Sequence, residues 1–208
     1  EDANGRNVAV GHSALETLNA GTDAYNVAVG FNAGKFITTG VQNTIVGGQA
    51  GDALTTGSYN TVFGYEALTT EDAHNGNTAI GYQTLRVQDA GANAYNTAVG
   101  HQAGLAVSTG VNNTLIGGFA GDALTTGNYN TALGYDALSA EDAHSGNTAI
   151  GALTLAQQDA GDDAFNTAVG YKAGYAVSTG VQNTIMGGFA GDALTTGERN
   201  TALGTYAL

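Results

Sequence analysis

The most restrictive feature of this 208-residue sequence is a phrase that returns at every seventeenth or nineteenth position, as in "NTAVGHQAG" at 96–104 and "NTAVGYKAG" at 166–174. Counted from its opening Asn, the phrase occurs twelve times, in steps of nineteen, seventeen, seventeen and seventeen positions that then repeat. Four successive steps together make one longer period, which runs, for example, from Asn7 to Asn77. The short units are therefore nested within a longer repeat. The opening residues form an Asn column: Asn7, Asn26, Asn43, Asn60, Asn77, Asn96, Asn113, Asn130, Asn147, Asn166, Asn183 and Asn200.

The longer period is well preserved. The segment "TGVQNTIVGGQAGDALTTG" begins at Thr39 and returns with few changes at Thr109 and Thr179. Two further residues after Leu208 would complete three full periods, so we expect the chain to belong to a longer array. We interpret the chain as one repeat array, residues 1–208, with superrepeats at 7–76, 77–146 and 147–208.

The length and composition of one unit indicate the fold class. Seventeen residues are too few for a helical-hairpin repeat, and 33 glycines together with many threonines oppose helix. The same length suits one coil of a β-solenoid, in which each turn of chain hydrogen-bonds to the turns above and below at about 4.8 Å. We therefore predict an all-β fold, a β-solenoid (β-roll) of about twelve coils of 17 to 19 residues. Such a stack would form a rod of roughly 55 to 60 Å.

Each position of the coil has a predicted role. The three residues after the Asn form a short strand, and the Gly that follows in every unit makes a turn, because Gly takes φ > 0 at little cost. We expect the stacked Asn side chains to form a ladder of amides that hydrogen-bond along the axis. The turn Gly column is Gly11, Gly30, Gly47, Gly64, Gly81, Gly100, Gly117, Gly134, Gly151, Gly170, Gly187 and Gly204.

Two further columns are apolar. The third is Ala in eight units and Ile, Val or Leu in the other four, whereas the fourth is always large. Successive strand residues point to opposite faces, so one column fills the coil interior and the other forms an outer apolar band. Which column lies inside is left open by the pattern. The fourth column is Val10, Val29, Val46, Phe63, Ile80, Val99, Ile116, Leu133, Ile150, Val169, Met186 and Leu203.

The outer band predicts association with identical chains. Soluble monomers rarely expose a continuous apolar band, and a parallel homo-oligomer about a long axis would cover it. A homotrimer, intertwined or side by side, is the expected form, and copies could also stack end to end. Other partners are less favoured: five Lys and Arg against 18 Asp and Glu argue against nucleic acid. No apolar run approaches the roughly 20 residues of a spanning helix, so membrane insertion is not expected.

Several phrases resemble those of a known class of fibrous protein. "NTALGYDAL" at 130–138, "NTAIG" at 147–151 and "TTGNYNTALG" at 125–134 resemble the repeats of bacteriophage tail-fibre shafts. They are similar, more distantly, to the heads of trimeric autotransporter adhesins, where "NSVAIG"-like phrases in shorter coils build a left-handed β-roll. The resemblance implies a trimer, an extracellular location and a part in attachment to a host-surface glycan or receptor.

The histidines do not form a catalytic pattern. His12 and His101 stand after the turn Gly, where Tyr stands in other units, which indicates a packing position. His74 and His144 are separated by one full longer period and are copies of one loop position. General acid–base catalysis needs a unique partner and a pocket, so we predict that the chain is not an enzyme.

Recurrent loop carboxylates are the candidate calcium ligands. Ca²⁺ takes oxygen ligands, but the spacing here matches neither an EF-hand nor the repeat-in-toxin nonapeptide. Solvated loop charges are the preferred interpretation, and no cofactor is predicted. The carboxylates are Asp52, Asp122 and Asp192 in "GDALTTG", and the pairs Glu71-Asp72 and Glu141-Asp142.

These observations favour a structural fibre, most simply a phage tail-fibre shaft in a virion. The alternative is a bacterial surface adhesin or extracellular filament whose coil-corner loops bind a glycan. Ice binding is a third hypothesis, suggested by the Thr column but weakened because regular double Thr rows are missing. A polysaccharide hydrolase would need a carboxylate pair at one unrepeated place, and the sequence has none that stands out.

Overall fold

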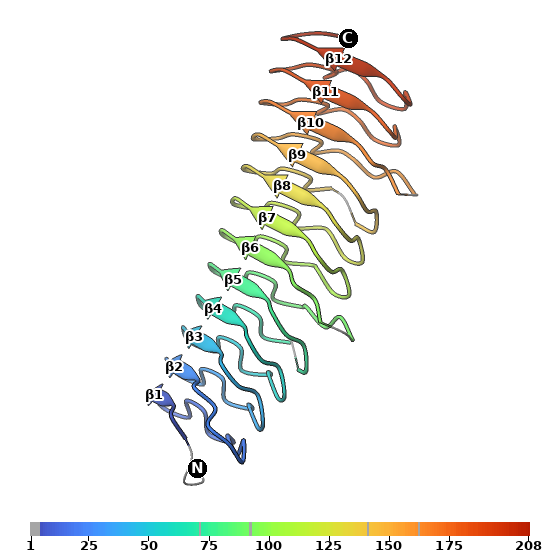
Figure 1. Cartoon of the computed structure of the whole chain (residues 1–208). Helices are drawn as coiled ribbons and strands as arrows, with labels where there is room; N and C mark the ends of the chain where they lie inside the picture. Colours follow the sequence, from blue (N-terminus) through green and yellow to red (C-terminus); the bar gives the residue numbers. More distant parts are fainter. Residues whose placement is uncertain (1–4, 71, 92, 141, 162) are drawn as a thin grey trace.

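The computed structural model describes residues 5–70, 72–91, 93–140, 142–161 and 163–208. Within these residues the chain winds into one slender stack of coils, each carrying a three-residue strand, so the predicted all-β solenoid is confirmed (Figure 1). The strands are β1 (Val8–Val10), β2 (Val27–Val29), β3 (Thr44–Val46), β4 (Thr61–Phe63), β5 (Thr78–Ile80), β6 (Thr97–Val99), β7 (Thr114–Ile116), β8 (Thr131–Leu133), β9 (Thr148–Ile150), β10 (Thr167–Val169), β11 (Thr184–Met186) and β12 (Thr201–Leu203).

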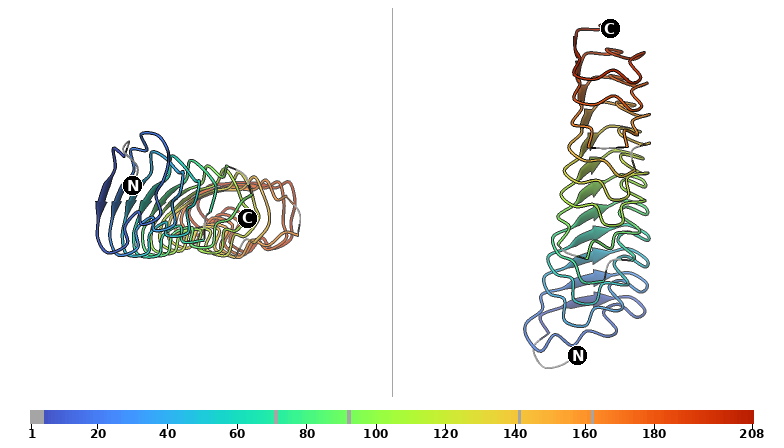
Figure 2. Two further views of the ribbon diagram at one scale, coloured as in Figure 1. Left: turned by 90° about the horizontal axis from the view of Figure 1, so that it is seen from below. Right: turned by 90° about the vertical axis from the view of Figure 1, so that its right-hand side faces the viewer.

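All twelve strands belong to one parallel sheet, in the order of the sequence. The strands form one wall of the stack, the irregular return segments form the other, and the two termini lie at opposite ends (Figures 1 and 2). The boundaries between superrepeats do not interrupt the sheet, because β4 pairs with β5 across the first and β8 pairs with β9 across the second. Each repeat of the sequence therefore adds a coil that is displaced along the same axis.

The longer of the two steps keeps the strands in register. Val8 pairs with Val27 across such a step, just as Val27 pairs with Thr44 across a shorter one. The additional residues are accommodated in the return loops, where Gly21, Gly91 and Gly161 have positive φ. A Cβ atom on any of these three glycines would meet nothing within 4 Å. These glycines thus face open space, and the strand columns stay aligned across the longer step.

The third column faces the coil interior, which resolves the question that the sequence left open. From β2 to β12 its residues are 0 to 2 % exposed, and they pack against aliphatic side chains of the return wall such as Leu68 and Leu85. At Ile45, Leu115 and Ile185 the facing position of the return wall is Gly: a Cβ on Gly121, for example, would lie 2.8 Å from Leu115 Cδ2. The buried members are Ala28, Ile45, Val62, Ala79, Ala98, Leu115, Ala132, Ala149, Ala168, Ile185 and Ala202.

The turn Gly column is confirmed, and the structure adds a second reason for it. All twelve glycines have φ between +117° and +143°. In addition, each coil lies very close to the next at this corner: a Cβ on Gly100 would stand 2.3 Å from the carbonyl oxygen of Gly117. Both the backbone conformation and the spacing between coils therefore require Gly here.

The Asn column forms a continuous chain of hydrogen bonds, but not the predicted ladder between amides. Asn96 Oδ1 accepts from the backbone N–H of Asn113 at 2.8 Å, and Asn113 Nδ2 donates across the coil to the carbonyl of Gly127 at 2.8 Å. The same arrangement recurs along the column, as at Asn183, and near the C-terminal end Asn200 Nδ2 also donates to Asn183 Oδ1, which is an amide-to-amide bond. The prediction was wrong in this respect, because buried backbone groups inside the coil need partners: a backbone N–H takes the amide oxygen and, in most coils, a backbone carbonyl takes the amide nitrogen.

Candidate interaction surface

The outer side of the strand wall carries the fourth column. Its side chains alternate in direction with the buried third column, and each is at least partly exposed. Val10 and Phe63 are each 56 % exposed and Leu203 is 73 % exposed. Because the strands are in register, these side chains form one unbroken apolar row along the stack. The predicted outer apolar band is therefore present.

A row of Thr residues accompanies the apolar row on the same wall. Each strand begins with Thr, or with Val in β1 and β2, and this residue points outward like the last residue of the strand. None of these outward strand positions carries a charged residue, although the chain has a net charge of −13. We call the Thr row and the fourth column together the outer face. Two such faces could therefore meet without bringing acidic side chains of their strands together.

Exposed aromatic rings lie at the ends of the strands. The residue before the Asn column is often Tyr or Phe; it has positive φ and is at least 46 % exposed. Tyr95 packs over Gly76, where a Cβ would lie 2.6 Å from Tyr95 Cδ1. The exposed members of this row are Tyr25, Tyr59, Tyr95, Tyr129 and Phe165.

A second row of rings follows the turn Gly. The ring centroids of Tyr82 and His101 are 5.2 Å apart and those of His101 and Phe119 are 5.0 Å apart. His12 likewise stacks on Phe31 at 5.6 Å. The prediction that His12 and His101 occupy packing positions is confirmed. These contacts join successive coils, so the row also contributes to the stiffness of the stack.

The carboxylates in "GDALTTG" do not gather into a calcium site. Asp122 is separated by four coils of the stack from Asp52 on one side and from Asp192 on the other. Burial raises the pKa of Asp52 and of Asp122, with backbone hydrogen bonds opposing the effect. In both residues the pKa is raised mainly because the surrounding protein excludes water from the carboxylate, and not because a second carboxylate of the same column lies nearby. Among the sequence candidates, Glu71 and Glu141 lie outside the described residues.

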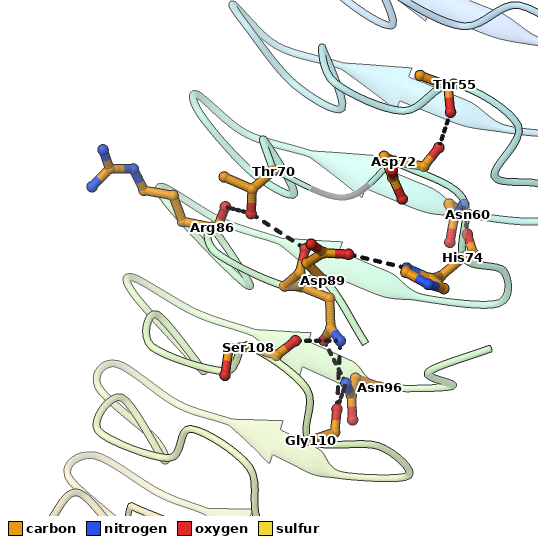
Figure 3. Close-up of polar contacts among 11 residues, drawn as sticks. Thr55, Asn60, Thr70, Asp72, His74, Arg86, Asp89, Asn96, Ser108 and Gly110 are labelled. Carbon is orange, nitrogen blue, oxygen red and sulfur yellow. Dashed lines mark hydrogen bonds and ion pairs between the residues drawn. The ribbon is translucent and has the colours of Figure 1, made fainter. Parts of the chain in front are cut away.

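Asp72 and Asp142 instead belong to two mixed clusters that the sequence did not predict. Asp72 lies with His74 and Asp89, and their potential ligand atoms are all within 4.8 Å of one another (Figure 3). An equivalent cluster contains Asp142, His144 and Asp159. Interpreting the two histidines only as copies of a loop position missed the Asp of the following coil. The signal present in the sequence was that the interval from His74 to Asp89 equals the interval from His144 to Asp159.

The part of the chain that the structure describes contains no helix long and apolar enough to cross a membrane. Comparison of the chain with protein-family models, with curated protein sequences and with solved structures gave no match. The resemblance to tail-fibre and adhesin repeats therefore rests on the sequence phrases quoted above, and the architecture rests on the stacked coils themselves.

Proposed function

We propose that this chain is a non-enzymatic structural segment of a fibre, in which the outer faces of identical parallel chains pack against one another. The observation that carries the proposal is the continuous, uncharged apolar row on a wall of twelve in-register strands. A stack in which each coil satisfies only its neighbours adds a fixed length per repeat, which is what a shaft requires. The number of repeated phrases then sets the length of the shaft.

Burial of the outer face supplies the driving force for assembly. Burial of apolar surface contributes about 25 cal/mol of favourable free energy per Å². The twelve partly exposed Val, Ile, Leu, Phe and Met side chains of the fourth column would therefore stabilise an assembly that buries them. A parallel arrangement about a common axis places the same column of every chain at the centre. A homotrimer is the proposed form, in agreement with the resemblance to trimeric fibres.

The proposed setting is the shaft of a phage tail fibre, outside the cell, where it contributes to attachment to a host. The alternative is a bacterial surface adhesin or extracellular filament with the same trimeric architecture. An intramolecular chaperone in the complete protein would support the first, and an outer-membrane anchor would support the second. Ice binding is less favoured, because the outer face pairs each Thr with a large apolar residue rather than with a second Thr.

Sedimentation of the purified chain tests the assembly. We expect the wild-type chain to sediment as an oligomer at micromolar concentration. The double substitution Ile80→Asp and Ile150→Asp places two carboxylates on the outer face, where both side chains are only partly buried. This variant should keep the circular dichroism of the wild type and sediment as a monomer, since charges in an apolar interface are costly to desolvate.

The matched control is Val87→Asp, which places a carboxylate at an exposed apolar position of the return segment. It should remain oligomeric. A wild-type chain that is a stable monomer, or a double variant that assembles as well as the control, would argue against packing through the outer face.

A further inference from the structure

The cluster formed by Asp72, His74 and Asp89 joins two successive coils. Asp72 and His74 precede β5, whereas Asp89 follows it in the next return segment. His74 Nδ1 lies 4.0 Å from Asp89 Oδ1, which is too long for a hydrogen bond. All three side chains place one potential ligand atom within 4.8 Å of the other two. Figure 3 shows Asp89 directed toward the imidazole of His74 across the gap between the coils.

The main chain on both sides of this gap is held in place. The carbonyl of Asp72 accepts a hydrogen bond from Thr55 Oγ1 at 2.6 Å, and the carbonyl of His74 accepts one from Asn60 Nδ2 at 3.0 Å. In the next coil, the backbone N–H of Asp89 donates to the carbonyl of Ser108 at 2.7 Å. The side chains thus project from fixed backbones. A fixed main chain is one requirement of a ligand set.

Burial differs between the donors in a way that suits a metal. The His74 side chain is 7 % exposed, whereas the Asp89 side chain is 63 % exposed and is free to adjust. Donors around tetrahedral Zn²⁺, at about 2.0 to 2.2 Å from the metal, are separated by roughly 3.3 Å. A small movement of the exposed carboxylates would bring the cluster to that spacing.

The second cluster repeats the first with the same geometry. His144 Nδ1 lies 4.0 Å from Asp159 Oδ1, the same as in the first cluster, and the His144 side chain is 8 % exposed. One longer period before the first cluster, the sequence has Asn4 in place of His74 and Asn19 in place of Asp89. The two residues therefore change together. Such joint replacement is expected of groups that share one role.

The donor set selects the class of cation. One imidazole nitrogen and two carboxylate oxygens suit first-row divalent metals, of which Zn²⁺ accepts three protein ligands and leaves a position for water. Ca²⁺ prefers six to eight oxygen ligands and gains little from an imidazole. A cation would also relieve the repulsion between two carboxylates in a chain with a net charge of −13.

We propose that each of the two clusters, Asp72-His74-Asp89 and Asp142-His144-Asp159, binds one divalent transition-metal ion, with Zn²⁺ as the best match. Each ion would link two successive coils through ligands on both. The inference is separate from the fibre proposal, since it concerns residues on two successive return segments and not the outer face.

Titration of the metal-free chain with Zn²⁺, followed by calorimetry, tests the proposal. We expect two ions per wild-type chain, one for His74→Asn, and none for the double substitution His74→Asn and His144→Asn. Asn4 stands at the equivalent position one longer period earlier in the sequence, so the fold should tolerate Asn here. Zn²⁺ should raise the midpoint of thermal unfolding of the wild type and leave that of the double variant unchanged.

Two further variants complete the design. The double substitution Asp89→Asn and Asp159→Asn changes only exposed side chains, and should also remove both binding events without affecting the fold. His12→Asn with His101→Asn, in the aromatic row, should retain both. Wild-type chain that takes up no Zn²⁺, stoichiometry that does not depend on His74 and His144, or equal competition by Ca²⁺ would each overturn the proposal.

Discussion

Replacing Gly100 with Ala should disrupt the stack in its middle and lower the free energy of unfolding by roughly 3 to 5 kcal/mol. The new Cβ would lie 2.3 Å from the carbonyl oxygen and 2.6 Å from the carbonyl carbon of Gly117, both backbone atoms of the next coil. In addition, φ at Gly100 is +142°, a conformation that L-residues avoid. Neither atom can move without opening the strand pairing of β6 with β7. Denaturant unfolding followed by circular dichroism measures the effect.

Gly91→Ala is the matched control, because it has the same change in side chain and also a positive φ. At Gly91 φ is +68° and no atom lies within 4 Å of the added Cβ. The expected cost is only that of a left-handed conformation, about 1 to 2 kcal/mol. Equal losses at the two positions would show that backbone conformation alone, and not the close approach of the coils, explains the Gly column.

Replacing Asn113 with Leu should lower the free energy of unfolding by roughly 2 to 6 kcal/mol, because two buried backbone groups each lose a partner. Asn113 Oδ1 accepts from the N–H of Asn130 at 2.9 Å, and Asn113 Nδ2 donates to the carbonyl of Gly127 at 2.8 Å. Leu has a similar volume and leaves both groups unsatisfied inside the coil. The loss is measured by the same denaturant unfolding.

Asn112→Gln is the control for this substitution. Asn112 is the exposed neighbour of Asn113, and Gln stands at its counterparts Gln42 and Gln182. The change should alter stability by less than about 0.5 kcal/mol. If Asn113→Leu were as well tolerated as Asn112→Gln, the Asn column would not hold the coils together and its recurrence would need another cause.

The period of the sequence was enough to predict the class of fold and the position of every strand. A unit this short with a fixed Asn and a fixed Gly leaves little choice but a stacked coil, and β1 to β12 follow the Asn residues one by one. Register was also predictable, because like columns stack on like columns. The repeat in the sequence and the pairing of strands from successive coils therefore have the same register.

The inward column could not be chosen from the strands alone. Both candidate columns are apolar, and alternation fixes only their relation to each other. The deciding residues belong to the return wall: Leu68 and Leu85 occupy part of the interior, and the narrow remaining space suits Ala79. Where the strand contributes Leu115, the wall carries Gly121. This complementarity becomes visible only when the path of the return segment is known.

The hydrogen bonds of the Asn column and the His–Asp clusters also could not be predicted without the path of the return segments. The Asn column was predicted to bond amide to amide, but Asn113 Nδ2 donates to the carbonyl of Gly127, which the turn places opposite it. His74 and Asp89 are separated by a whole strand, and they meet because one coil lies above the next. Contacts between coils at the ends of the return segments are set by the winding of the chain, which the repeat period does not specify.

Insertion of a second copy of residues 77–146 tests the central claim that each repeat adds one increment of length. Four more coils at about 4.8 Å should lengthen the particle by roughly 19 Å and leave its cross-section unchanged. Small-angle X-ray scattering measures the maximum dimension and the cross-sectional radius of the same sample. An increase of about 10 % in all dimensions, as a globule of the added mass would show, would contradict the stacked coils.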